Sequence, residues 1–438
     1  DVDVRRMHPF QANRHYLRER TTETLGLLYA MHWPDRQYAT ARGARRSPFH
    51  HHLMEQGAVM AEQSGWERPG WFAPEGAERC YAYSWGRPDW HSHVAVECLA
   101  VRDRVALFDQ SSFTKLLVTG PDALVVLNHV SAAELDVAPG RVVYTQWLND
   151  RGGIEADLTV TRTGEVDFLV ITTAGGQTRD RAWLEAHIPS QARCSIFDAT
   201  SGLPMLGLMG PQSRALLERV SGEALANEAF PFATSRELEI GYARVRASRI
   251  TYVGELGYEL YIPAEFAAHV LEVLLEAGAD FGLRHAGYHA MNACRTEKGY
   301  RHYGHDIGVE DTAIEAGLGF AVGWKKAEFV GREALLRQRE VGVPCRRLVQ
   351  VTLADSTKLL HHEEPIWVGG ELVGAITSGA FGHRIDASLG MGYVRNPAGV
   401  TGDWLEGTAF EIEVGLERVP ARLSLAPAYD PKNERIRA

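Results

Sequence analysis

The feature that most constrains the fold of this chain is a change of pattern near residue 340. Before this point helical and strand-like segments alternate; residues 263–278, for example, carry apolar side chains at helical spacing between an initial proline and a final glycine. After it the helices vanish, short strand-like segments recur at 347–353, 364–368, 372–377 and 410–414, and Gly369-Gly370 marks a hairpin turn. The pattern predicts an α+β region followed by a small separate β domain, a barrel or a sandwich.

A length of 438 residues allows two to four packed units. We predict three parts: an extension over residues 1–94, an α+β region over 95–340 and a C-terminal β domain over 341–438. The extension is rich in Arg, His and aromatic residues, and its stretch 65–74 (GWERPGWFAP) contains two prolines. We therefore expect an extended, loop-like connector over 65–74.

Charge and cysteine content narrow the class of function. The chain has 46 Lys and Arg against 56 Asp and Glu, a net charge of −10, which disfavours binding to nucleic-acid phosphates or anionic membranes. Its five cysteines are scattered without a CxxC pair, so a disulfide framework or a structural zinc site is not expected and a reducing, cytoplasmic setting fits best. No apolar run approaches the ~20 residues that span a bilayer. The run His50-His51-His52 does not predict a metal site, because consecutive side chains point in different directions.

A first candidate site follows a glycine turn in residues 149–160 (NDRGGIEADLTV). The two glycines make a tight turn, and the two-residue period of a strand puts Glu155 and Asp157 on one face. A carboxylate in this place could accept a hydrogen bond from a cationic or N–H-bearing reactant. The alternative, a hairpin turn flanked by two solvated acids, stays open on the pattern alone.

A second candidate is Glu259 in residues 249–260 (RITYVGELGYEL), where it stands in an otherwise apolar strand. An inward-facing carboxylate there needs hydrogen-bond donors, because burying an unpaired charge is costly. A pterin ring offers two adjacent N–H donors that one carboxylate can accept together. The alternative is an outward-facing Glu in an alternating strand.

A third candidate is the cationic stretch 292–306 (NACRTEKGYRHYGHD), in which Arg295, Lys298 and Arg301 place positive charge near a helix end. Cations there complement the helix dipole. The functional alternative is an anion site for a carboxylate tail or a glutamyl chain, and the pattern does not separate the two.

In this order the segments resemble the glycine-cleavage T-protein (aminomethyltransferase) superfamily, and most of all the folate-binding C-terminal half of dimethylglycine and sarcosine dehydrogenases and oxidases. The landmarks in register are residues 108–115, 152–157, 208–214, 252–259, 295–306, 329–332 and 390–394. Residues 32–34, 40–43, 46–48 and 65–69 are similar to the linker that joins the flavin domain to the folate domain in those dehydrogenases. No GxGxxG motif stands at the start, so we expect this chain to lack the flavin domain.

The resemblance implies a three-domain cloverleaf around a central folate site, with two interleaved α+β subdomains and a C-terminal β-barrel. It also implies tetrahydrofolate as cofactor, Asp157 as the catalytic residue, and Tyr252, Glu259 and Arg295 as cofactor-binding residues. Thr173 stands where many T-proteins have an Asn beside the ligand, so we expect it to face the substrate and the identity of the substrate to differ.

The expected activity is transfer of a methylene or methyl group from a small amine-like or methylated donor to tetrahydrofolate. A separate FAD-containing amine oxidase that docks on residues 1–75 is one expected partner; a stand-alone folate-dependent demethylase is the other possibility. Two rivals remain: a non-catalytic folate-binding or regulatory protein, and a recruited fold that acts without folate.

Overall fold

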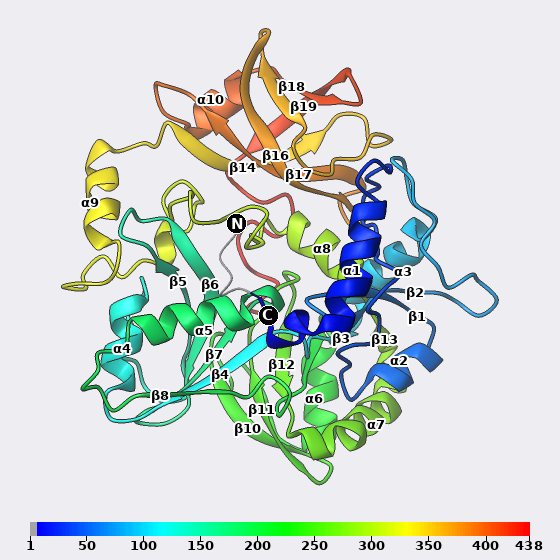
Figure 1. Cartoon of the computed structure of the whole chain (residues 1–438), viewed down its shortest axis with the longest axis vertical. Helices are drawn as coiled ribbons and strands as arrows, with labels where there is room; N and C mark the ends of the chain where they lie inside the picture. Colours follow the sequence, from blue (N-terminus) through cyan, green and yellow to red (C-terminus); the bar gives the residue numbers. More distant parts are fainter. Residues whose placement is uncertain (1–6) are drawn as a thin grey trace.

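The computed structural model describes residues 7–438, which form three lobes around a common centre (Figure 1). Each lobe is built on its own β-sheet, and helices join the sheets near the centre. The predicted α+β class and the cloverleaf arrangement are confirmed. Among the described residues, no helix has the length and apolar character needed to cross a membrane.

The first lobe holds a six-stranded sheet. In order across the sheet, its strands are β10 (Ser235–Ile240), β11 (Ala243–Ser248), β12 (Gly257–Tyr261), β9 (Met205–Met209), β3 (Ala106–Asp109) and β13 (Arg284–His285). One face packs on helices α6 (Ser213–Ser221) and α7 (Ala267–Gly278). Tyr258 and Leu260 of β12 belong to this apolar core. Because side chains alternate along a strand, Glu259 between them faces the other side of the sheet.

The second lobe holds a five-stranded sheet and is inserted between strands of the first. Its strands, in order, are β5 (Val142–Leu148), β6 (Ile154–Arg162), β7 (Asp167–Thr172), β4 (Thr114–Thr119) and β8 (Ser195–Asp198). Helices α4 (Ala123–Val130) and α5 (Gln177–Ala186) contribute to its core. Strand β3 precedes this sheet in sequence while β9 follows it, so the chain leaves the first lobe and returns. Gly152, at φ 82°, makes the tight β5–β6 turn that the sequence predicts.

The third lobe is a closed β-barrel, which confirms the predicted C-terminal β domain. Its strands, in order, are β14 (Arg346–Leu353), β17 (Ala387–Arg395), β16 (Glu371–Gly382), β15 (Pro365–Val368), β18 (Phe410–Val414) and β19 (Glu417–Ser424). Helix α9 (Arg332–Val341) precedes it. The prediction that helices vanish was wrong, because α10 (Gly402–Gly407) lies between β17 and β18, capped by the Thr401 side chain. Six residues are too few to establish a helical period in the sequence.

The extension carries helices and a hairpin. Its elements are η2 (Pro9–Ala12), α1 (Arg14–Gly26), α2 (His50–Glu55), β1 (Ala58–Gln63), β2 (Trp66–Phe72) and α3 (His91–Asp103). The prediction of a loop over residues 65–74 was wrong, since most of the stretch is strand β2. Burial of Trp66 and Trp71 stabilises the strand. Pro69 is tolerated because the sheet has two strands and its register shifts between Val59 and Met60, beside the proline.

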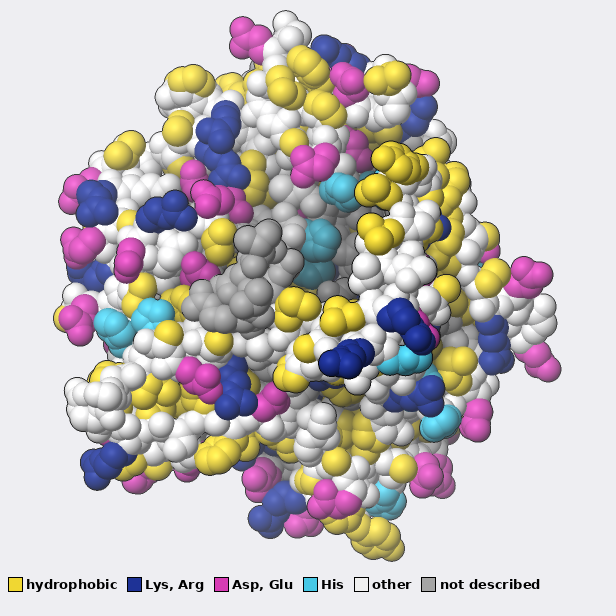
Figure 2. Space-filling model, in the orientation of Figure 1, with side chains coloured by type: hydrophobic (Ala, Val, Ile, Leu, Met, Phe, Trp, Pro, Cys, Tyr) yellow, Lys and Arg dark blue, Asp and Glu magenta, His cyan; other side chains and the backbone are white. Residues whose placement is uncertain are grey.

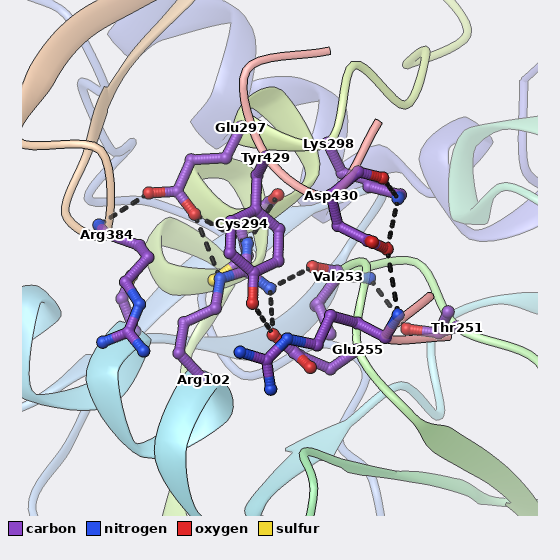
Figure 3. Close-up of polar contacts among 12 residues, drawn as sticks. Arg102, Thr251, Val253, Glu255, Cys294, Glu297, Lys298, Arg384, Tyr429 and Asp430 are labelled. Carbon is purple, nitrogen blue, oxygen red and sulfur yellow. Dashed lines mark hydrogen bonds and ion pairs between the residues drawn. The ribbon is translucent and has the colours of Figure 1, made fainter. Parts of the chain in front are cut away.

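Helix α8 (Tyr288–Glu297) lies at the meeting point of the lobes, in contact with α3, β2, β16 and β17. Its C-terminal end joins a buried network of charges around Arg102 (Figure 3). The Arg102 side chain is fully buried and pairs with Glu297 at 2.7 Å and with Glu255 at 3.5 Å. The other Glu297 oxygen accepts the backbone N–H of Arg384, next to β16, at 2.7 Å.

The C-terminal segment completes this network. The Arg102 guanidinium lies 4.1 Å from the centre of the Tyr429 ring, and the Tyr429 hydroxyl donates to Glu255. The Lys298 ammonium pairs with Asp430 at 2.8 Å. The network therefore ties α3, α8, the barrel and the C-terminal segment into one body.

Removing one charge from this network should destabilise the fold. Glu297→Gln keeps the side-chain shape but leaves buried Arg102 short of a carboxylate, so we expect the free energy of unfolding to fall by about 3–5 kcal/mol in urea denaturation. The matched control is Asp103→Asn, whose partner Arg384 is 35% exposed, and it should change this free energy by less than about 1 kcal/mol. Equal losses in the two variants would contradict a role for the network in joining the lobes.

Candidate functional site

A cavity of about 1660 Å³ lies between the lobes. Figure 2 shows this face of the molecule hollowed near its centre, with histidine side chains visible in the hollow. The cavity wall includes residues of both sheets, α8, the barrel and the extension, and all five residues predicted for the site line it: Asp157, Thr173, Tyr252, Glu259 and Arg295.

Glu259 presents a buried carboxylate to this cavity, with 8% of the residue exposed. Its Oε2 accepts a hydrogen bond from the Tyr261 hydroxyl at 2.7 Å, whereas in the described part of the chain no donor contacts Oε1. Burial raises the pKa of Glu259 to about 7, against the opposing effects of that hydrogen bond and the Lys115 charge. The outward-facing alternative is contradicted, and one carboxylate oxygen is left for a donor inside the cavity.

A buried lysine lies close enough to Glu259 for their charges to interact. Lys115 is fully buried in β4, and its ammonium donates to the Ser111 carbonyl at 2.7 Å. Burial lowers the pKa of Lys115 to about 7, while the charge of nearby Asp109 opposes this shift. The pKa values of Lys115 and Glu259 both lie near neutral pH. A ligand that donates a hydrogen bond to Glu259 would favour the ionised form of this carboxyl group.

Asp157 lies on the cavity wall in β6, where Ile154, Ala156 and Leu158 alternate with it and face the core. Its cross-strand partner Gln146 donates to Oδ1 at 2.9 Å. Burial raises the pKa of Asp157 to about 6, against the effects of Gln146, Tyr144 and the Arg301 charge. A carboxyl group with this pKa can both accept and return a proton near neutral pH.

Tyr252 and Thr173 are each held by hydrogen bonds to the backbone. The Tyr252 hydroxyl donates to the Arg301 carbonyl at 2.8 Å, and its ring stacks on Tyr300 with 6.2 Å between centroids. Thr173 uses its hydroxyl to accept the Gly176 N–H at 3.1 Å, as the cap of a short 3-10 helix, η3 (Ala174–Gly176). Both residues line the cavity, and their predicted ligand roles stay predictions.

The three predicted cations differ in what they contact. Arg295 is 2% exposed and pairs with Asp306 at 2.5 Å, and Lys298 pairs with Asp430. Arg301 donates to two backbone carbonyls, at 2.7 and 2.9 Å. The charges of Arg295 and Lys298 are thus balanced within the protein, so Arg295 supports the cavity wall through an ion pair. Its predicted contact with a cofactor stays a prediction.

Sequence reasoning missed the neighbours that tune Asp157. Tyr144 and Gln146 are two residues apart in β5, so their side chains lie on the same face of the strand. Tyr144 lines the cavity, and Gln146 donates a hydrogen bond to Asp157. The hairpin alone did not reveal this pair, because counting outwards from the glycine turn pairs Gln146 with Ala156. A register shift between Trp147 and Leu148 brings Gln146 opposite Asp157 instead. Among the described residues, no three His, Cys, Asp or Glu side chains are grouped so that they could hold a metal ion.

Comparison with known protein families gives three matches. The GCVT N-terminal domain family matches residues 49–326, and the glycine cleavage T-protein C-terminal barrel domain family matches residues 346–430. The FAD dependent oxidoreductase central domain family matches residues 1–47. The first two matches cover the three sheets around the cavity.

Individual proteins agree with these matches. The chain is 44% identical over 437 residues to 4-methylaminobutanoate oxidase (formaldehyde-forming) of Paenarthrobacter nicotinovorans, covering 100% of this chain and 52% of that protein. It is 32% identical over 445 residues to the mitochondrial pyruvate dehydrogenase phosphatase regulatory subunit of Mus musculus, covering 98% and 51%. The chain therefore spans about half the length of these curated relatives. The solved glycine cleavage system aminomethyltransferase T from Bartonella henselae matches with a TM-score of 0.75 and 26% identity, over 89% of this chain and 99% of that one.

The raised pKa of Glu259 makes a prediction about stability. Glutamate ionises near 4.5 without the fold and near 7 within it, so the folded state binds more protons between these values. The stability that the Glu259 proton contributes is complete below pH 4.5 and is lost as pH rises through about 7.

When the pH is raised from about 5 to about 8, we therefore expect the free energy of unfolding of the wild type to fall relative to that of Glu259→Gln, by on the order of 3 kcal/mol. Thermal unfolding at both pH values measures this difference. The control Glu239→Gln changes an exposed acid of the same sheet and should show no such dependence. If the stability difference between Glu259→Gln and the wild type does not change with pH either, the Glu259 carboxylate is ionised throughout this pH range.

Proposed function

The chain belongs to the glycine-cleavage T-protein family, and from this membership we propose that it binds tetrahydrofolate and transfers a one-carbon unit between the folate and a small methylated or amine-like donor. The observation that carries the proposal is the Glu259 carboxylate, which is buried on the cavity wall and whose Oε1 receives no hydrogen bond from the described residues. Such a group needs a donor, because an ionised carboxylate without one is costly in a low-dielectric site. A pterin supplies two adjacent N–H donors.

The rest of the cavity suits such a ligand. Tyr252 and Tyr300 offer aromatic surface for a planar ring, and Lys115 supplies a nearby positive charge that favours the ionised form of Glu259. The volume of about 1660 Å³ exceeds the ~300–1,000 Å³ of usual small-molecule pockets. It therefore has room for a folate and a second small molecule together.

Asp157 is the residue that we assign to the reaction. Bound tetrahydrofolate would supply a nucleophilic nitrogen, N5, for the carbon that leaves the donor. Gln146 orients the Asp157 carboxylate through Oδ1, and burial keeps its pKa near 6, so Asp157 can accept or return the proton that accompanies the transfer. Alignment of the partners within the cavity supplies a further part of the rate.

The origin of the donor carbon is also part of the proposal. The match to an oxidoreductase domain at residues 1–47 and the likeness to one half of an amine oxidase support a flavin-containing oxidase unit that works with this chain. We propose that this unit oxidises a methylated amine and that the cavity receives the product. Detection of FAD bound to the full-length protein, or co-purification with a flavoprotein, tests this association; full turnover by this chain alone contradicts it and favours a stand-alone demethylase.

A second candidate function is a non-catalytic role, which the likeness to a phosphatase regulatory subunit favours. The two functions differ at Asp157, because holding a pterin requires Glu259 but not a proton-transferring acid beside it. A regulatory protein should bind tetrahydrofolate without transferring a carbon to it.

Binding is tested by equilibrium titration with tetrahydrofolate. We expect the wild type to bind and Glu259→Gln to bind roughly 10- to 100-fold more weakly, because a neutral amide replaces a charged acceptor of two hydrogen bonds. Glu239→Gln should leave the Kd unchanged. Absence of binding by the wild type would favour a fold that acts without folate.

Catalysis is tested by Asp157→Asn in the presence of a methylated amine and its oxidase. We expect kcat to fall by roughly 10²- to 10⁴-fold while the Kd for tetrahydrofolate stays near the wild-type value. If ionised Asp157 accepts the proton, the wild-type rate rises with pH and levels off above about 6, because the active form is the carboxylate. Asp150→Asn, in the exposed turn before β6, is the control. Unchanged activity in Asp157→Asn would exclude this mechanism.

A further inference from the structure

Arg68 is an arginine of the cavity wall that has no acidic partner among the described residues. Arg68 lies in β2, within the stretch of residues 65–69 that resembles a linker, and it lines the cavity. Its neighbour Glu67 faces the other side of the strand and pairs with Arg42 at 2.6 Å. Among the described residues, no carboxylate oxygen lies within 4.0 Å of the Arg68 guanidinium.

The position of Arg68 is nevertheless well defined. Its guanidinium lies over the Tyr288 ring, 3.8 Å from the centroid, and Tyr288 is held at the start of α8 by an Oη–Oγ contact of 3.2 Å with Ser112. The Arg68 Nε is buried and has no hydrogen-bond acceptor among the described residues. A partly buried cation without an acidic partner is costly, so an anion that enters the cavity beside this guanidinium would be stabilised.

Four other cations of the cavity wall are already neutralised or satisfied, and a fifth, Arg437, is exposed to solvent. Arg295 pairs with Asp306, Lys298 with Asp430, and Arg179 with Asp180 at 2.7 Å. Arg301 donates to backbone carbonyls. Arg68 differs from these four because, among the described residues, it has neither an acidic partner nor a hydrogen bond to a backbone carbonyl, and its guanidinium lies over the Tyr288 ring.

The histidines near Arg68 do not change this balance. Burial lowers the pKa of His302 to about 3, and the same cause lowers the pKa of His289. The His289 Nε2 lies 3.2 Å from the Tyr81 hydroxyl. Both rings are therefore neutral at pH 7, so they add neither a competing cation nor a compensating negative charge.

We propose that Arg68 is the anchor of a carboxylate-binding subsite in this cavity, an inference that rests on the proposed folate-dependent transfer. A guanidinium forms two parallel N–H···O bonds to a carboxylate, and stacking on Tyr288 fixes its plane for that contact. Two ligands of the proposed reaction carry this group: the glutamate portion of tetrahydrofolate, and a carbon donor that is an N-methylated amino acid.

Two ligand pairs distinguish these sources in calorimetric titrations of the intact protein. The first pair is tetrahydrofolate and tetrahydropteroyl amide, which keeps both ring systems and lacks the glutamate carboxylates. The second is 4-(methylamino)butanoate and N-methylpropylamine, which lacks the carboxylate. The variants are Arg68→Gln, Arg68→Lys and, as control, Arg244→Gln, which changes an arginine whose side chain is 71% exposed.

We expect the wild type to prefer the carboxylate in at least one pair by roughly 10- to 100-fold. Arg68→Gln should remove this preference by weakening the binding of the carboxylate-bearing ligand, and it should not change the affinity for the ligand without a carboxylate. Arg68→Lys should keep part of it, because charge remains while the paired geometry is lost. Arg244→Gln should behave as the wild type.

The pair that loses its preference identifies the source of the carboxylate. A wild type without a preference in either pair, or a preference that survives in Arg68→Gln, overturns the subsite. If the wild type binds neither folate compound but shows an Arg68-dependent preference for 4-(methylamino)butanoate, the subsite stands and the folate-dependent function fails. Thermal unfolding of Arg68→Gln near the wild-type temperature shows that any loss arises at the subsite.

Discussion

The burial of charge is the constraint on which this structure depends. The pairing of Arg102 with Glu297 and Glu255 removes three charged groups from water at the junction of the lobes, and it is tolerated because each group has further hydrogen bonds. This junction closes the lobes around a cavity in which carboxylates are poorly solvated. The raised pKa values of Asp157 and Glu259 follow from that closure, so the interactions that stabilise the fold also set the proton affinity of the site.

Helix α8 links the two roles, because contacts at both of its ends stabilise the fold and several of its residues line the cavity. At its start, the buried carboxylate of Glu97 accepts the N–H groups of Phe72 and Gly287, at 2.7 and 2.8 Å, which fixes α8 against the strand that carries Arg68. Burial raises the pKa of Glu97 to about 8, although both backbone hydrogen bonds oppose the shift. At its end Glu297 meets Arg102. Movement of α8 would therefore disturb the fold and the cavity wall together.

Local periodicity was enough to predict some parts of this molecule and not others. The two-residue period put Asp157 on a defined face of β6, but it left the direction of Glu259 in β12 open, and the resemblance implied the roles of both acids. Four of the six barrel strands were predicted, whereas β17 and β19 were not. Strand β2 was missed because the two prolines of residues 65–74 indicate a loop, whereas burial of Trp66 and Trp71 decides the outcome. The partners of Arg295 and Lys298 were also out of reach, since Asp306 and Asp430 are brought to them by the tertiary fold.

The polar groups of the cavity fall into two kinds, and the difference carries chemical meaning. Arg295, Lys298 and Thr173 are satisfied by the protein itself, so they shape the wall without requiring a ligand. Among the described residues, the Oε1 atom of Glu259 lacks a donor and the Arg68 guanidinium lacks an acidic partner, so each gains from a ligand of the opposite hydrogen-bonding character. A molecule with N–H donors at one end and a carboxylate at the other satisfies both. The unsatisfied atoms therefore limit the chemical class of the ligand more strictly than the charged residues do, because most of those charges are paired within the protein.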